Sequence, residues 1–179
     1  MLGRVALAAT AGSLALASPA GASERGWDKA SDISRDALLV AAFGVPLLHG
    51  DLEGAGSAAL SQAATRLATR TIKKTVREER PDGSDDLSFP SGHTSAGFAA
   101  AATLHKRYGW QYGVPAYAVA SFTGLARVQA RKHYVHDVIA GAALGTAGGW
   151  LLTRRRNDQV QWIPWGDSKG AGVQLSYRF

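Results

Sequence analysis

Apolar residues recur at helical spacing along most of the chain and at strand spacing only near its C-terminus. The clearest helical repeat consists of Leu60, Ala63, Ala64, Leu67, Ala68 and Ile72. Intervals of three and four residues place these side chains on one face of a helix. Glycine, proline and polar clusters divide the pattern into helices expected at 34–48, 57–79, 93–108, 115–127 and from His133 or His136 to 153. The pattern therefore predicts an all-α bundle of about five to six helices.

The C-terminal segment alternates apolar and polar residues with a period of two. Its apolar positions are Val160 and Trp162, then Val173, Leu175, Tyr177 and Phe179. Proline, aspartate and glycine residues lie between the two runs, as is typical of a turn between paired strands. We expect residues 157–179 to form a short β-hairpin tail packed on a helical domain of residues 23–156.

The first 22 residues have the three parts of a secretory signal peptide. Arg4 supplies a positive charge, residues 5–17 are uncharged and rich in alanine and leucine, and Ala20 and Ala22 are small residues at the positions a signal peptidase reads. The apolar run is short of the ~20 residues that a membrane span needs. We therefore expect cleavage near Ala22 and export to a bacterial periplasm, with a retained membrane anchor as the alternative.

Three later stretches, 37–48, 114–126 and 137–152, are also apolar but short for a membrane span. Together with a mean hydropathy of −0.08, this favours a soluble exported bundle that associates at most with a membrane surface. An integral membrane protein remains the alternative. Alanine dominates the apolar residues and there are 21 glycines, so the core should consist of closely approaching helices.

Charge and cysteine content narrow the possible partners. The formal net charge of +6 suggests an anionic partner. Aromatic residues do not alternate with the basic ones, which argues against nucleic acid. The chain has no cysteine, which excludes disulfides, thiolate nucleophiles and cysteine-ligated metals.

Lys73 and Arg80 form the first candidate chemical element. They stand about two helical turns apart on the expected second helix, and Pro81 would end that helix directly after Arg80. Cations fixed in this way can bind an anionic group such as a phosphate, although solvated charges on a helix face are the commoner reason for such a pair.

The second element is Ser91-Gly92-His93, directly after Pro90. Glycine allows a close backbone approach to an oxyanion, and a serine that caps the next helix directs its first free N–H groups at the anion. The histidine has an ordinary pKa of about 6.5 and could protonate a leaving group. A plain helix cap followed by a surface histidine is the alternative interpretation.

Arg127, His133 and Asp137 form the third element. A histidine and an aspartate four residues apart share a helix face if the helix includes both. The carboxylate would then hold one ring nitrogen as a donor and leave the other free to attack. A purely structural His–Asp pair is the competing interpretation, and His136 is the competing histidine.

In this order, the three elements resemble the motifs of the type 2 phosphatidic acid phosphatase (PAP2) family, which includes bacterial class A acid phosphatases and vanadium haloperoxidases. The family pattern is K-x6-R-P, P-S-G-H and S-R-x5-H-x3-D, and here it extends from Lys73 to Asp137. One departure is Ala126, which stands where the pattern has serine and removes a hydroxyl contact with the phosphate.

The resemblance implies a helical bundle and metal-independent hydrolysis through a phosphohistidine, with no cofactor. His133 would attack phosphorus, Asp137 would orient it and His93 would protonate the leaving oxygen. The phosphoryl oxygens would be held by Lys73, Arg80, Arg127 and the backbone around Ser91 and Gly92.

The expected function is hydrolysis of a phosphomonoester or pyrophosphate, on a soluble molecule or on a lipid. One alternative is a non-catalytic exported module that binds phosphate or anionic lipid through the same cations and through residues 154–156. A vanadate-dependent haloperoxidase is a further alternative, for which the chain is short.

Overall fold

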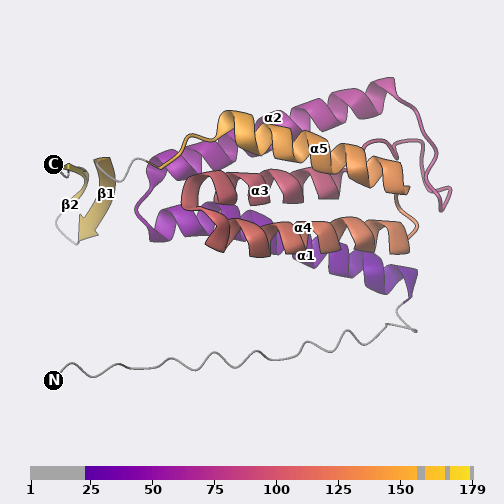
Figure 1. The fold of residues 1–179 in the computed structure, drawn as a ribbon, viewed down its shortest axis with the longest axis horizontal. Helices are drawn as coiled ribbons and strands as arrows, with labels where there is room; N and C mark the ends of the chain where they lie inside the picture. Colours follow the sequence, from indigo (N-terminus) through magenta and orange to yellow (C-terminus); the bar gives the residue numbers. More distant parts are fainter. Residues whose placement is uncertain (1–22, 157–159, 168–169, 178–179) are drawn as a thin grey trace.

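The computed structural model describes residues 23–156, 160–167 and 170–177. Within these residues the chain forms the helices α1 (Glu24–Leu48), α2 (Leu52–Thr75), α3 (Gly92–Tyr108), α4 (Trp110–Gln129) and α5 (Val135–Leu152), and the strands β1 (Val160–Asp167) and β2 (Gly170–Tyr177). Helix α3 packs against all four other helices and lies between them in Figure 1. The all-α bundle is thus confirmed, whereas the predicted signal peptide lies outside the described residues.

The first two helices depart from their predicted ranges. Helix α1 begins at Glu24 instead of Ser34, because Ser23 caps it by accepting a hydrogen bond from the Gly26 N–H at 3.2 Å. Helix α2 begins after the Asp51 cap and ends at Thr75 instead of residue 79. The predicted end was wrong because the chain after Thr75 turns to pair with residues 85–88, with the Glu78 N–H donating to the Asp86 carbonyl at 3.0 Å. Arg80 therefore lies in a loop and not at a helix terminus.

The later helices differ from prediction at their N-termini. Gly109, with a φ of 87°, alone separates α3 from α4, so α4 begins at Trp110 and contains Pro115. A left-handed backbone conformation of this kind favours glycine. Helix α5 begins at Val135, so His133 precedes the helix that carries Asp137.

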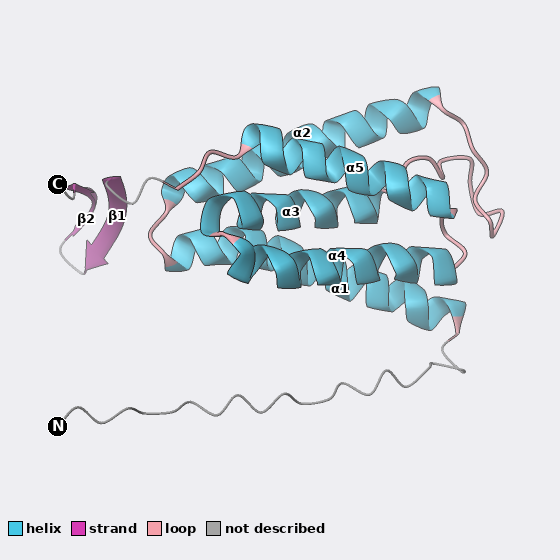
Figure 2. Cartoon of the chain, viewed as in Figure 1, coloured by secondary structure: helices cyan, strands magenta, loops and turns pink. Residues whose placement is uncertain are grey.

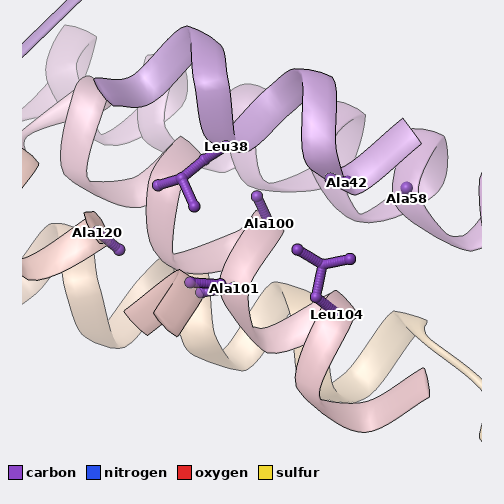
Figure 3. Packing of buried hydrophobic residues seen from close by; sticks show 8 residues of the cluster. Leu38, Ala42, Ala58, Ala100, Ala101, Leu104 and Ala120 are labelled. Atoms are coloured by element: carbon purple, nitrogen blue, oxygen red, sulfur yellow. The ribbon is translucent and has the colours of Figure 1, made fainter. Parts of the chain in front are cut away.

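Small side chains form the core of the bundle. The buried cluster in Figure 3 contains six alanines and two leucines, Leu38 and Leu104. Helix α5 approaches α3 so closely that a Cβ atom at Gly145 would clash with the Ser95 carbonyl oxygen. The expected close approach of helices is therefore realised through alanine and glycine.

Many large apolar side chains lie on the outside instead. The most exposed are Leu48 at 88%, Leu151 at 80% and Val40 at 71%. Of the described helices, α5 alone is long and apolar enough to cross a membrane, by length and composition only. The bundle thus combines a core of small residues with apolar outer faces on several helices.

The predicted hairpin is confirmed, with β1 and β2 antiparallel and Val160 paired with Tyr177. In Figure 2 the two strands stand beyond one end of the helices. In the described part of the chain, the extensive contacts of each strand are with the other strand. The packing of the hairpin on the bundle stays a prediction.

Candidate active site

The predicted site residues come from the end of the bundle opposite the hairpin (Figure 1). They occupy the last turns of α2 and α4, the first turns of α3 and α5, and the two loops between these helices. The charge of Arg127 lowers the pKa of both His93 and His133. His93 therefore lies within electrostatic reach of Arg127, 34 positions later in the sequence, as His133 does.

His133 is held by a buried carboxylate. Its Nδ1 lies 3.2 Å from Oδ2 of Asp137, and the two side chains are 2% and 0% exposed. The same Oδ2 accepts hydrogen bonds from the Ser88 hydroxyl at 2.6 Å and from the Tyr134 N–H at 2.9 Å. Because a carboxylate accepts, Nδ1 of His133 carries the proton and Nε2 carries a lone pair. The expected pairing therefore forms although His133 lies outside the helix.

Electrostatics favour the neutral form of the His133 imidazole. Burial, followed by the charges of Arg127, Arg80 and Lys73, lowers the pKa of its imidazole. Nη1 of Arg80 lies 3.4 Å from Nε2 of His133. Burial opposes ionisation of Asp137, but hydrogen bonds from Ser88 and Tyr134 keep its pKa below the usual value. The pair is thus a neutral imidazole beside a carboxylate.

Lys73 and Arg80 are fixed by the loop between α2 and α3. Nζ of Lys73 donates to the carbonyl oxygens of Leu87 at 2.5 Å and Ser88 at 2.9 Å. Burial, with the charge of Arg80 next in importance, lowers the pKa of Lys73 to about 8. Nε of Arg80 donates to Asp85 at 2.6 Å. Both cations are therefore held in place before any ligand binds.

Arg127 is the most deeply buried of the three cations, at 5% exposed. Its Nη1 forms an ion pair with Asp28 and lies 3.2 Å from the Ser31 hydroxyl. Its Nε is buried without a hydrogen-bond partner among the described residues. A buried donor is costly to leave unpaired, so this N–H is suited to an incoming anion. The neighbouring Ala126 is fully buried.

Ser91 caps α3 as predicted. Its hydroxyl accepts from the Thr94 N–H at 3.5 Å, and its own N–H donates to the Asp137 carbonyl at 3.0 Å. The first N–H groups inside the helix, at Gly92 and His93, have no acceptor within the helix. A Cβ atom at Gly92 would meet only Thr69 Cγ2, at 3.9 Å. At Gly92, open space therefore lies next to backbone N–H groups that have no acceptor. The Ser91 N–H, in contrast, already donates to the Asp137 carbonyl.

His93 is held from the opposite side, by α1. Its Nε2 lies 2.7 Å from Oδ1 of Asp32 and also contacts Nη1 of Arg35. One nitrogen cannot donate to the carboxylate and accept from the guanidinium at once, so the two contacts belong to different protonation states. Burial, then the charge of Arg127, lowers the pKa of His93 to about 4, while Asp32 raises it and Arg35 lowers it.

Sequence reasoning missed Asp28, Asp32 and Arg35 on α1, as well as Ser88. The three α1 residues follow at intervals of four and three, so they share one helix face. This polar stripe is the signal that could have found them, but the predicted helix began only at Ser34. Ser88 lies in an irregular loop, and its contact with Asp137 has no signature in the sequence.

Among the described residues, one group of side chains could hold a metal ion. Ligand atoms of Glu78, His136 and Asp137 lie within 4.8 Å of one another. Glu78 and His136 already pair at 2.7 Å. Oδ1 of Asp137 has no hydrogen-bond partner in the described part of the chain and lies 3.3 Å from Nε2 of His136.

Comparison with solved structures supports the fold. The structure matches that of Aquifex aeolicus LpxE with a TM-score of 0.62 and 18% identity, covering 72% of this chain and 84% of that one. It matches a transmembrane PAP2 type phosphatidylglycerolphosphate phosphatase from Bacillus subtilis with a TM-score of 0.58 and 21% identity, covering 72% and 74% of the two chains.

Comparison with curated sequences gives lipid A phosphatases among the relatives. A lipid A 1-phosphatase of Porphyromonas gingivalis is 47% identical over 76 residues, which cover 40% of this chain but only 17% of that protein. A lipid A 4'-phosphatase of Helicobacter pylori is 28% identical over 153 residues, covering 75% and 77% of the two chains. The sequence profile of the PAP2 superfamily matches residues 54–161, which contain all three motifs. The chain therefore belongs to the PAP2 superfamily.

Proposed function

We propose that this chain is a phosphatase that hydrolyses a phosphate ester of a lipid through a phosphohistidine intermediate. The observation that carries the proposal is a buried His133, hydrogen-bonded to Asp137 through Nδ1 and surrounded by the charges of three cations. The unpaired Nε of Arg127 adds a donor without an acceptor. Such an arrangement suits a group that arrives with several negatively charged oxygens.

In the proposed first step, Nε2 of His133 attacks phosphorus as the bond to the leaving oxygen breaks. Protonated His93 gives its proton to that oxygen, so the alcohol leaves neutral. The Nδ1–H group of His133 keeps its hydrogen bond to the Asp137 carboxylate. This carboxylate stabilises the positive charge that the imidazole ring gains. In the second step, water attacks phosphorus and the P–N bond breaks. His93 takes the proton of the water, which restores the enzyme and releases phosphate.

A lipid substrate is supported by the relatives of the chain and by its outer surface. Besides the two lipid A phosphatases, the chain is 34% identical over 82 residues to a probable diacylglycerol pyrophosphate phosphatase of Schizosaccharomyces pombe. The exposed apolar side chains of α1, α4 and α5, including Val40, Phe122 and Ile139, would hold the chain at a membrane. The predicted export would place the site in the periplasm.

Substitution of the nucleophile tests the proposal. We expect His133→Ala to lower kcat/KM for an aryl phosphate by more than about 10³-fold, as loss of a nucleophile does in other hydrolases. His136→Ala is the matched control, because it removes an exposed histidine three residues away. Its activity should stay near that of the unmodified protein. Equal activity of His133→Ala and the unmodified protein would overturn the phosphohistidine mechanism.

The same assay separates the alternatives. Phosphate binding without hydrolysis of any ester would favour the non-catalytic module, and peroxide-dependent bromide oxidation with added vanadate would favour a haloperoxidase. Activity should persist with a chelator present. Its loss on chelation, with recovery on adding metal, would instead assign a role to Glu78, His136 and Asp137.

A further inference from the structure

A groove leads away from the candidate active site along the side of the bundle. Its volume is about 400 Å³, and it lies between α1, α2 and α3. Lys73, Gly92 and His93 line the part next to the phosphate site, and Thr65 and Arg66 line the part further along α2. The groove is therefore continuous with the site and extends beyond it.

The walls of this groove carry more positive charge than one phosphate requires. Arg66, Arg70 and Lys73 follow at intervals of four and three on α2, and Arg35 faces them from α1. The side chains of Arg66 and Arg70 have no ion pair or hydrogen bond within the described part of the chain. The carboxylate in the lining, Asp36, already binds Nε of Arg35 at 2.9 Å.

The like charges of Arg66 and Arg70 destabilise helix α2 unless an anion binds between them. Two cations four residues apart on a helix repel each other. The matched planar donors of arginine suit phosphate or carboxylate oxygens. Arg66 and Arg70 are thus arranged as a receptor for an anionic group that the structure itself does not supply.

Residues with hydroxyl side chains also line the groove. Thr65 is 3% exposed, and its hydroxyl has no hydrogen-bond partner in the described residues. Further along the floor, the hydroxyls of Thr69 and Ser95 lie 3.0 Å apart. Buried hydroxyls are normally paired. The Thr65 hydroxyl lies against Gly148 of α5, where an added Cβ atom would meet it at 2.2 Å, so it does not contribute to the ligand surface of the groove.

The spacing defines what kind of anion fits. At 1.5 Å per residue, Arg70 and Arg66 lie about 4.5 Å and about 10 Å from Lys73 along the helix axis. A second phosphate joined directly to the first would stay beside Lys73. An anion on a linker would reach the two arginines.

We propose that the groove binds a second anionic group of the substrate, carried on a linker about 5–10 Å from the phosphate that is cleaved. This inference rests on the proposed phosphatase function. It defines the substrate class as phosphate esters with a second phosphate or a carboxylate, and Arg66 and Arg70 as the residues that select them.

Soluble alkyl phosphates test the proposal without a membrane. The comparison is the kcat/KM of hexanediol bisphosphate, corrected for its two equivalent phosphates, divided by the kcat/KM of hexyl phosphate. A phosphohexanoate gives the corresponding ratio for a carboxylate. We expect ratios above one for the unmodified protein. Substitution of Arg66→Gln together with Arg70→Gln should reduce the larger ratio about tenfold, because each arginine loses a charge-assisted hydrogen bond.

Lys74→Ala is the matched control, since Lys74 is an exposed cation on the same helix that does not line the groove. Its ratios should equal those of the unmodified protein. An unchanged ratio in the double arginine variant, with hydrolysis intact, would overturn this inference and leave the phosphatase function standing. Failure of the unmodified protein to cleave either alkyl phosphate or an aryl phosphate would overturn both. Thermal unfolding of the double variant verifies that its exposed substitutions leave the fold intact.

Discussion

The two ends of the bundle each contain a buried arginine paired with an aspartate, yet only one pairing is complete. At the hairpin end, Nε and Nη2 of Arg107 donate to Asp51 at 2.7 and 2.5 Å. Its Nη1 donates to the Arg154 carbonyl at 3.0 Å. At the other end, Arg127 binds Asp28 through Nη1 and has no partner for Nε within the described residues.

This difference separates an arginine that holds the fold from one that is available to a ligand. Every nitrogen of the Arg107 guanidinium has an acceptor, so a further anion would have nothing to gain there. Arg127 is equally buried but keeps a free donor beside the neutral His133. Burial of a charge alone is therefore a poor guide to function, whereas an incomplete set of partners is a better one.

The largest effect is expected from Arg107→Ala, on stability. Removing the guanidinium leaves the buried Asp51 carboxylate without its main partner, and such losses cost about 3–5 kcal/mol. Denaturant unfolding followed by circular dichroism measures the change. The activity per folded molecule should stay close to normal. An unfolding midpoint like that of the unmodified protein would contradict the conclusion that Arg107 stabilises the fold.

Arg127→Ala should affect activity more than stability. We expect kcat/KM for an aryl phosphate to fall about 10²–10³-fold, the usual loss for one donor that stabilises transition-state charge. Its partner Asp28 is 37% exposed, so water can solvate the carboxylate left behind. Arg131→Ala is the control, because Arg131 is an exposed arginine nearby, 3.8 Å from Glu24. A normal rate in Arg127→Ala would contradict the assignment of its free Nε to the phosphate.

Substitutions of Asp32 and Arg35 should move the pH dependence in opposite directions. Activity requires protonated His93, so kcat/KM falls as the pH rises through the pKa of that residue. Asp32 raises this pKa and Arg35 lowers it. Asp32→Asn should therefore shift the alkaline limb to lower pH and Arg35→Gln to higher pH, each by up to about one unit. Shifts in the same direction would rule out His93 as the acid they control.

The residues of the candidate site could be proposed from local sequence, but the residues that support them could not. The motif around Ser91 predicted both a helix cap and an open backbone, because those properties follow from adjacent residues. The contact of Asp32 with His93 joins residues 61 positions apart. Such a contact depends on how α1 packs against α3, and no short-range pattern encodes it.

Helix boundaries illustrate the same limit. The predicted helix ended at Glu79 because residues 76–79 continue a charged, helix-compatible run. The structure instead places Glu78 in a bridge with Leu87, a long-range pairing that overrides local propensity. Lys73 and Arg80 still converge, because both side chains donate to the Leu87 carbonyl oxygen, at 2.5 and 3.4 Å. The prediction of the pair was useful although the prediction of its helix was wrong.

The smallest expected effect is on stability in acid, and it tests only the Arg107–Asp51 pair at the hairpin end of the bundle. Burial of Asp51 opposes its ionisation, but hydrogen bonds from Arg107, Tyr108 and the Gly54 N–H lower its pKa to about 2 from 3.8. A lowered folded-state pKa stabilises the protein above pH 3.8, and this contribution is lost as the pH falls toward 2. The slope of unfolding free energy against pH should therefore be shallower in Asp51→Asn over this window, by at most about 1.4 kcal/mol per pH unit. Arg127→Ala should keep the slope of the unmodified protein, because Asp51 and its partners are intact there. If the slope of unfolding free energy against pH were the same in Asp51→Asn as in the unmodified protein, other carboxylates would govern stability in acid. Titration of Asp51, the partner of Arg107, would then not be the cause.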